Sequence, residues 1–190
     1  MARPSVREQI VDAAFEQFHL NGYNACGVKL ITDTAGVPKG SFYNHFESKE
    51  ALALEVMDRY AASRRMEDLA RDDTAPLARL RAHFEFLAAD IERFGYSRGC
   101  VFGNFTTEAA DHSAPIADGV KSGFATWVQA VSALLREALE DGSLPAHHDP
   151  DVLALFVVNA WEGAIVGARA AKDGSSFAAF FRVVFDSVLV

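Results

Sequence analysis

Cysteine and positive charge are both scarce in this chain of 190 residues. The two cysteines, Cys26 and Cys100, are too few for the disulfide framework of a small secreted protein. Lysine and arginine number 18 against 26 aspartate and glutamate residues, a formal net charge of −8. This balance excludes binding to nucleic acid through general basic charge, so any contact with DNA would need a locally basic face on an acidic body.

A signal region is also lacking, because the first residues, MARPSVREQ, contain no apolar stretch. No apolar run is close to the ~20 residues that a membrane-spanning helix needs. Half of all residues are hydrophobic, which excludes a disordered chain and allows a substantial core. We therefore expect a soluble, cytoplasmic protein of one or two domains.

Neither strand-like alternation nor an internal repeat is visible in the sequence. The six prolines all fall near predicted helix boundaries, where a missing N–H group costs little. We expect an all-α fold, with a three-helix domain over residues 1–47 and a larger helical domain over residues 48–190. The helices are predicted at about residues 5–21, 28–34, 38–46, 48–69, 76–94, 100–110, 115–140, 150–171 and 175–190. Ser5, Ser48 and Asp149 are predicted to cap the first, fourth and eighth of these helices, and Gly22 is predicted to end the first.

The stretch AGVPKGSFYNHF, residues 35–46, predicts a sharp turn followed by a short helix. Gly36 supplies the positive φ angle that the turn needs, and Pro38 suits the first position of the helix. Phe42 and Phe46 lie four residues apart on one face, which is expected to pack inward. The rest of this short helix is dense in polar and aromatic groups, which favours contact with a partner. These groups are Lys39, Ser41, Tyr43, Asn44 and His45.

The segment GYNACGVKLITDTAGVPKGSFYNHFESKEAL, residues 22–52, resembles the helix-turn-helix of the TetR family of transcriptional repressors. Its glycines, the AGV turn, the second helix and the Ser-Lys-Glu that follows match without a gap. The resemblance implies a homodimeric, ligand-responsive DNA-binding protein. The first domain would then bind DNA, and the second would bind an effector and dimerise. Neither enzymatic activity nor a cofactor is expected.

Ten residues are predicted to contact DNA. Lys39 can reach a phosphate or a guanine edge, Asn44 can bind adenine, and Ser41 suits either base or phosphate. The resemblance implies phosphate contacts for Tyr43 and His45. The alternative is that both are exposed side chains on a helix surface with no role in binding. Many family members have Thr or Ser where this chain has Cys26-Gly27, so the phosphate contact there falls to backbone N–H groups. The full set is Gly27, Val28, Lys29, Lys39, Gly40, Ser41, Tyr43, Asn44, His45 and Lys49.

A dimer is expected because one such unit reads too few bases, whereas two units ~34–36 Å apart would read a palindrome. The helices near residues 149–171 and 175–190 are the predicted interface. The first carries a ridge of small residues, and the second is apolar around most of its circumference. An ordinary core within one chain is the alternative interpretation. The ridge consists of Asn159, Gly163, Gly167 and Ala171.

The effector site is predicted less sharply. Cys100 lies at a helix start near Arg98, a setting that favours the thiolate. Residues 99–104, GCVFGN, also resemble a TetR branch that includes electrophile-responsive repressors. A buried structural cysteine is the alternative. No metal site is expected, since the histidines of His147-His148-Asp149 sit in a loop and the aspartate caps a helix. The candidate effector residues are Cys100, Phe102, Asn104, Trp127, Trp161 and Lys172.

Three functions remain open at the level of sequence. The first is a repressor that an inducer releases from a palindromic operator, and the second is an activator or co-regulator with the same DNA-binding unit. The third is a small-molecule-binding protein or an enzyme. No nucleophile–base pair, glycine-rich phosphate loop or strong metal spacing supports catalysis.

Overall fold

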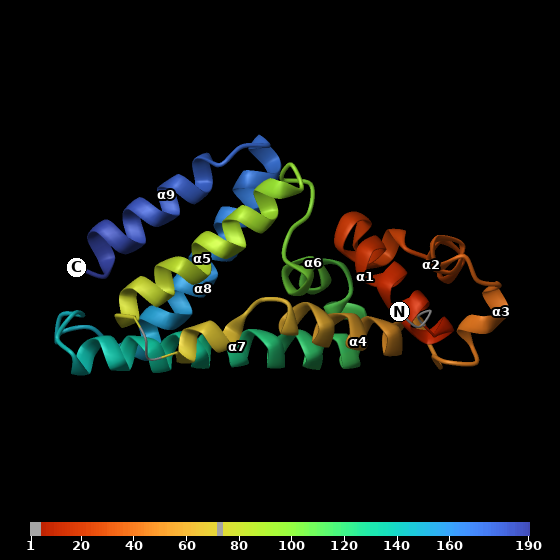
Figure 1. Ribbon diagram of the computed structural model, residues 1–190, viewed down its shortest axis with the longest axis horizontal. Helices are drawn as coiled ribbons and strands as arrows, with labels where there is room; N and C mark the ends of the chain where they lie inside the picture. The colour runs from red at the N-terminus through yellow and green to blue at the C-terminus, as the bar shows by residue number, and fades with distance from the viewer. Residues whose placement is uncertain (1–4, 72–73) are drawn as a thin grey trace. The chain divides into compact units, whose positions relative to one another are not determined.

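The structure is a computed structural model that describes residues 5–71 and 74–190 (Figure 1). Within these ranges the regular elements are helices and no strand is present, which confirms the all-α prediction. The main helices are α1 (Val6–Ala25), α2 (Val28–Ala35), α3 (Lys39–Phe42), α4 (Lys49–Ala62), α5 (Pro76–Arg93), α6 (Val101–Glu108), α7 (Ala114–Glu140), α8 (Pro150–Ala171) and α9 (Ser175–Val183). Short elements are η1 (Met66–Ala70), η2 (Ala110–His112) and the π-helical η3 (Val184–Val188).

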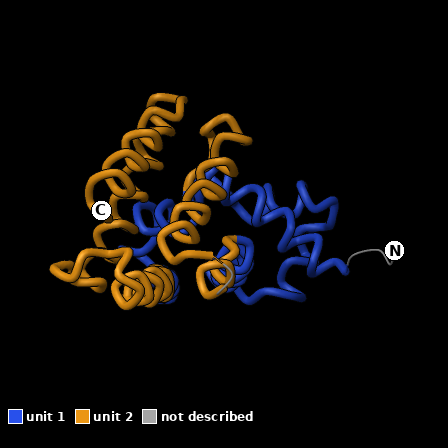
Figure 2. The backbone as a smooth tube through the Cα atoms, turned by 60° about the vertical axis from the view of Figure 1, so that its left-hand side comes forward, with its two compact units in different colours: residues 1–63, 100–123 blue, residues 64–99, 124–190 orange. Residues whose placement is uncertain are grey.

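The chain divides into two compact units (Figure 2). The first unit comprises residues 1–63 and 100–123, and the second comprises residues 64–99 and 124–190. The domain boundary predicted after residue 47 falls inside the first unit, because α4 packs against α1 there. Residues 1–4 of the predicted first domain lie outside the described residues. A functional division at residue 47 stays a prediction.

Helix α1 organises the first unit, in which it packs against α2, α4 and α6. It starts as predicted, because the Ser5 hydroxyl accepts a hydrogen bond from the Glu8 N–H at 3.2 Å. The end predicted at Gly22 is a break in helical geometry, with φ 80° and ψ 176°, after which one more turn reaches Ala25. The core around α1 includes Phe18 and Phe105, whose ring centroids are 5.6 Å apart.

Helix α4 is shorter than the sequence predicted. It begins at the predicted cap, where the Ser48 hydroxyl accepts from the Ala51 N–H at 3.1 Å. We predicted that it would run towards Leu69, but it ends at Ala62. Arg65 follows with φ 55°, a left-handed conformation that stops an α-helix, and the chain continues as η1. No glycine or proline lies between Ser48 and Leu69, so the sequence gave no signal that the helix ends at Ala62.

The second unit is built around an aromatic core of α5, α8 and α9, which lie side by side in Figure 1. Trp161 of α8 is buried between Phe84 of α5 and Phe177 of α9, with ring centroids 5.1 and 4.9 Å away. Burial of each such side chain contributes roughly 1.5–3 kcal/mol. Helix α8 has its predicted bounds because the Asp149 carboxylate accepts from the amides that follow, with Pro150 at the first position.

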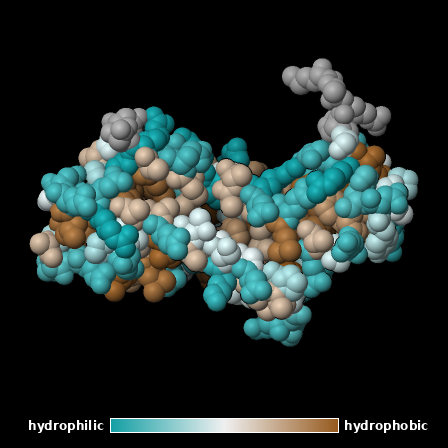
Figure 3. Space-filling view, turned by 90° about the horizontal axis from the view of Figure 1, so that it is seen from below, coloured by the Kyte–Doolittle hydropathy of each residue, from teal (hydrophilic) through white to brown (hydrophobic). Residues whose placement is uncertain are grey.

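Helix α8 also bears on the membrane prediction. By length and composition it is apolar enough to cross a membrane, so the prediction that no apolar run is close to ~20 residues was wrong. One face of α8 is buried in the second unit, through residues such as Val157 and Ile165. The core helix of a globular protein passes the same test of length and composition. On the face drawn in Figure 3, hydrophilic residues surround separate apolar patches.

Candidate nucleic-acid interface

The turn between α2 and α3 has the conformation that the sequence predicted. Gly36 adopts φ 68° and ψ 30°, in the left-handed region. Its N–H donates to the Asp33 carbonyl at 3.1 Å, and the Val37 N–H donates to the Thr32 carbonyl at 3.0 Å. These bonds satisfy the last carbonyls of α2. A Cβ atom at Gly36 would meet nothing within 4 Å, so the backbone angle alone demands glycine.

Helix α3 is a single turn rather than the predicted two turns. Regular helix covers Lys39–Phe42, and the next residues continue through tighter bonds. The Asn44 N–H donates to the Ser41 carbonyl at 3.3 Å, and the His45 N–H donates to the Phe42 carbonyl at 3.0 Å. Phe42 and Phe46 are buried as predicted, with ring centroids 5.7 Å apart. These two rings anchor the short segment on the first unit.

The opposite side of this segment is open to solvent. Tyr43 is 60% exposed and stands edge-on to Phe42 at 5.1 Å between ring centroids. Ser41 is half-buried. The remaining predicted contact residues of the segment are exposed, namely Lys39, Gly40, Asn44 and His45. The segment therefore presents hydrogen-bond donors and acceptors on a rigid base, as base and phosphate recognition requires.

The start of α2 forms a second exposed group. Gly27 is the N-cap and is exposed, and no side chain caps the helix. Its first turn can therefore offer N–H groups to an anion. Val28 is half-buried, whereas Lys29 is exposed and forms an ion pair with Asp33. Backbone binding of a phosphate at this helix start, predicted from the departure at Cys26-Gly27, remains compatible with this geometry.

Lys49 is held in a way that the sequence did not predict. Its Nζ donates to the Tyr23 carbonyl at 3.0 Å and lies 3.8 Å from the centroid of the Tyr23 ring. Desolvation by burial lowers the Lys49 pKa, an effect that Cys26, Glu108 and Glu50 oppose. Lys49 thus ties the start of α4 to the end of α1. Contact of Lys49 with phosphate stays a prediction and would require it to leave this position.

Two further residues lie next to the predicted contact residues: Cys26 precedes Gly27 in the chain, and Arg7 contacts the Phe46 ring. Cys26 is buried in the first unit, where its Sγ donates to the Gln17 carbonyl at 3.1 Å. Burial raises the Cys26 pKa, although Lys49 acts in the opposite direction. The guanidinium of Arg7 lies 5.0 Å from the Phe46 ring centroid and pairs with Glu55 of α4. The sequence pattern missed Arg7, because its partners are about forty or more residues away in the chain.

The candidate effector residues are divided between the two units. In the first unit, Cys100 is buried at the N-cap of α6, and Phe102 and Asn104 are half-buried on that helix. In the second unit, Trp127 and Trp161 both contact the ring of Phe84.

Two charged side chains named in the sequence analysis have other contacts. The Nζ of Lys172 donates to the Tyr96 carbonyl at 3.2 Å. The guanidinium of Arg98, proposed as a cation near Cys100, lies 3.8 Å from the Phe94 ring centroid. Among the described residues, no group of three or more His, Cys, Asp or Glu side chains could hold a metal ion.

Comparison with known families agrees with this geometry. Residues 10–56 match the family described as bacterial regulatory proteins, tetR family. Residues 76–184 match the tetracyclin repressor-like C-terminal domain. The chain belongs to the TetR family. Regulators of this type bind DNA operators and act as dimers, and they are not enzymes.

Individual relatives of this TetR-family chain support the same assignment. The HTH-type transcriptional repressor DhaR of Mycobacterium sp. strain GP1 is 35% identical over 196 residues, covering 100% of this chain and 95% of DhaR. The transcriptional regulator AcuR of Cereibacter sphaeroides is 34% identical, covering 85% of this chain and 75% of AcuR. The crystal structure of a regulatory protein TetR from Rhodobacter sphaeroides has a TM-score of 0.87 and 32% identity, covering 94% of this chain and 96% of that one.

Proposed function

We propose that this TetR-family protein is a cytoplasmic, dimeric repressor that an inducer releases from a palindromic operator. The observation that carries the proposal is the exposed face of residues 39–45, fixed on the first unit by buried Phe42 and Phe46. Such a short polar segment on an apolar anchor suits insertion into the major groove. The name of DhaR as a repressor supports the direction of regulation.

Contacts on DNA divide into two kinds. Asn44 would read the edge of adenine, and Lys39 and Ser41 would each bind a base edge or a phosphate. Tyr43, His45 and the backbone at Gly27 would bind phosphates and set the register. Because the chain is acidic overall, these local contacts must supply the affinity.

The dimer would form through α8 and α9. Several large apolar side chains on these helices remain exposed in the single chain, and burial by a second copy would remove them from water. Gly163 supports this role, because a Cβ atom there would meet nothing within 4 Å. At Gly167, by contrast, a Cβ atom would meet the Ser176 side chain of the same chain. The predicted ridge of small residues would therefore contact α9 of its own chain at Gly167 and the second copy at Gly163. The exposed residues are Val152, Leu155, Phe156, Val166 and Val183.

A route from Cys100 to the DNA-contacting helices exists inside the first unit. Cys100 caps the start of α6, and Glu108 at the end of α6 is hydrogen-bonded to Asn24 of α1. Modification of the buried thiol by an electrophile would displace α6 and disturb the segment just before α2. Release then needs only a higher affinity of the inducer for the displaced state.

Fluorescence anisotropy with DNA from upstream of the protein's own gene tests this proposal. Wild type and Cys100→Ser are titrated before and after a mild thiol electrophile. Binding by both proteins and release of wild type alone would support Cys100 as the sensor. Binding without release in either protein would contradict the thiol mechanism, whereas a failure of both to bind would contradict autoregulation.

A further inference from the structure

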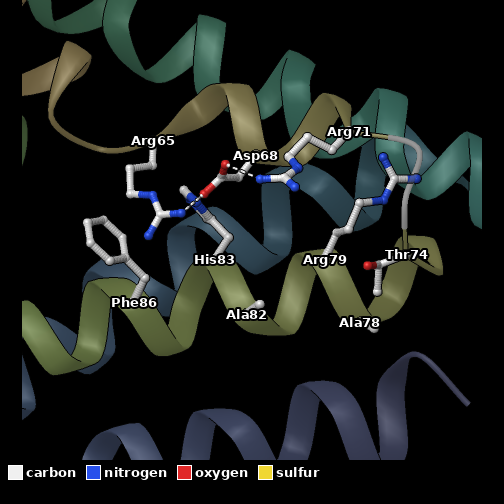
Figure 4. Close-up of a pocket in the computed structure, with 9 residues that line it drawn as sticks. All are labelled: Arg65, Asp68, Arg71, Thr74, Ala78, Arg79, Ala82, His83 and Phe86. Atoms are coloured by element: carbon white, nitrogen blue, oxygen red, sulfur yellow. Dashed lines mark ion pairs between the residues drawn. The ribbon is translucent and has the colours of Figure 1, made fainter.

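A pocket of about 250 Å³ lies in the second unit between η1 and the part of α5 from Ala78 to Phe86 (Figure 4). The candidate effector residues named from the sequence do not line it. Its polar lining includes Arg65, Asp68, Arg71, Arg79 and His83. Figure 4 shows the His83 side chain pointing from α5 towards Asp68, which lies between Arg65 and Arg71.

His83 contributes an unsatisfied donor to this pocket. The residue is 4% exposed, and its Nε2 accepts a hydrogen bond from Trp127 Nε1 at 3.1 Å. Burial, and to a smaller extent Arg64, lowers the His83 pKa to about 4, so the ring is neutral at pH 7. A neutral ring that accepts at Nε2 carries its proton on Nδ1. Nδ1 is buried without a hydrogen-bond partner.

Arg79 contributes a second donor of the same kind. Its side chain is 7% exposed, one terminal nitrogen donates to the Leu69 carbonyl at 2.9 Å, and the other pairs with Glu137. The Nε atom is buried and has no partner. Two unsatisfied buried N–H donors on successive turns of one helix are costly unless an acceptor joins them.

The charges around the pocket favour an anion as that acceptor. The described lining residues include three arginines and one aspartate, and Asp68 forms ion pairs with both Arg65 and Arg71. Arginine is well suited to planar oxyanions because its N–H groups form a fork. The remaining wall is apolar through Ala78, Ala82 and Phe86. An organic group can therefore accompany the anion.

We propose that this pocket binds the oxyanion, carboxylate or phosphate, of a small organic molecule. The oxyanion takes the position between Arg65 and Arg71 that Asp68 now occupies, and it accepts from His83 Nδ1 and Arg79 Nε. Because both nitrogen atoms are shielded from solvent, η1 must shift when the ligand enters. Since η1 directly follows α4 in the chain, such a ligand would serve as an inducer, and only this role rests on the proposed function.

Tryptophan fluorescence of the full-length protein, without DNA, measures binding directly. Trp127 is hydrogen-bonded to His83, so a ligand in the pocket would change the environment of the Trp127 ring. Benzoate and inorganic phosphate are the probes, and choline at equal ionic strength controls for salt. We expect a saturable change with at least one anion and none with choline. Benzoate alone would identify an organic acid, and phosphate alone would identify a phosphorylated compound.

Variants assign the response to the pocket. Arg65→Gln removes a lining charge from a half-exposed side chain, and we expect the dissociation constant to rise roughly tenfold. Arg79→Lys keeps the charge beside Glu137 but removes Nε, and it should weaken binding in the same direction. Arg93→Gln, at the exposed end of the same helix, is the matched control and should stay within about twofold.

Two results would overturn the proposal. One is the lack of a saturable response to either anion in folded wild-type protein. The other is equal weakening by Arg65→Gln and Arg93→Gln. Because DNA is absent from this assay, its outcome is independent of operator binding. Benzoate or phosphate binding with no effect on a DNA complex would keep the pocket and remove only its role as an inducer site.

Discussion

The backbone N–H of Asn24 donates to the Glu108 carboxylate at 2.9 Å, and the Asn24 side chain donates to the Glu108 carbonyl at 2.8 Å. These two bonds join the end of α6 to the last turn of α1, three residues before α2. They depend on Gly22, since a Cβ atom there would overlap the Glu108 carboxylate. The helix break at Gly22 therefore both redirects the chain and makes room for this contact.

The first prediction concerns that glycine. Gly22→Ala should lower the free energy of unfolding by about 1–3 kcal/mol, because φ 80° strains an alanine and the added carbon displaces Glu108. Urea denaturation measures this change. Gly40→Ala is the control, because Gly40 lies in a helix and a Cβ atom added there would meet nothing within 4 Å. This substitution should leave the free energy of unfolding unchanged or raise it slightly. Equal stability of both variants would contradict the role given to Gly22.

Exposed and buried residues of the DNA-contacting segment should behave differently. Lys39→Gln should leave stability within about 0.5 kcal/mol of wild type but reduce the slope of log affinity against log salt by about 0.9. Phe42→Ala should cost about 3–5 kcal/mol of stability, because the ring is fully buried. Anisotropy at several salt concentrations and thermal unfolding separate the two. An unchanged salt slope for Lys39→Gln would exclude a phosphate contact of Lys39.

Stability should fall in acid through His83. Its pKa is about 4 in the folded protein against 6.5 when unfolded, so the unfolded chain binds more protons between these values. The contribution of neutral His83 to the free energy of unfolding is complete above pH 6.5 and is lost as the pH falls towards 4. The loss is at most about 3 kcal/mol. His83→Gln should flatten this part of a stability–pH curve. Identical curves for wild type and His83→Gln would refute the assignment.

The dimer surface can be tested at one exposed leucine of α8. Leu155 is 53% exposed in the single chain, so Leu155→Lys should leave the fold intact. It should nevertheless weaken the dimer by roughly tenfold or more, because a lysine charge would be desolvated at the interface. Sedimentation equilibrium measures the change. Leu20→Lys, 42% exposed on α1, is the control, and equal dissociation in both variants would place the interface elsewhere.

Local signals predicted much of the fold. The caps at Ser5, Ser48 and Asp149 and the turn at Gly36 lie where the sequence placed them, because each depends on a few adjacent residues. The early end of α4 was missed, since the left-handed angle of Arg65 has no sequence signature.

Contacts between residues far apart in the sequence could not be predicted from such local signals. The sequence did not reveal the contact of Lys49 with Tyr23, 26 positions away, whereas the contact of Lys49 with phosphate stays a prediction. The pocket of Arg79 and His83 was equally hidden. Its two buried donors lack an acceptor in the folded protein, and the spacing of residues along one helix does not reveal a missing acceptor.

The central claim is that a dimer of this protein recognises a specific DNA site through residues 39–45. The most direct measurement is anisotropy of the purified dimer with a library of upstream DNA fragments and with scrambled DNA, at several salt concentrations. We predict a preference of at least about 10³-fold for a site with two half-sites one helical turn apart, lost in the double variant Lys39→Ala, Tyr43→Ala. Equal, weak binding of all fragments by folded wild-type dimer would contradict the account.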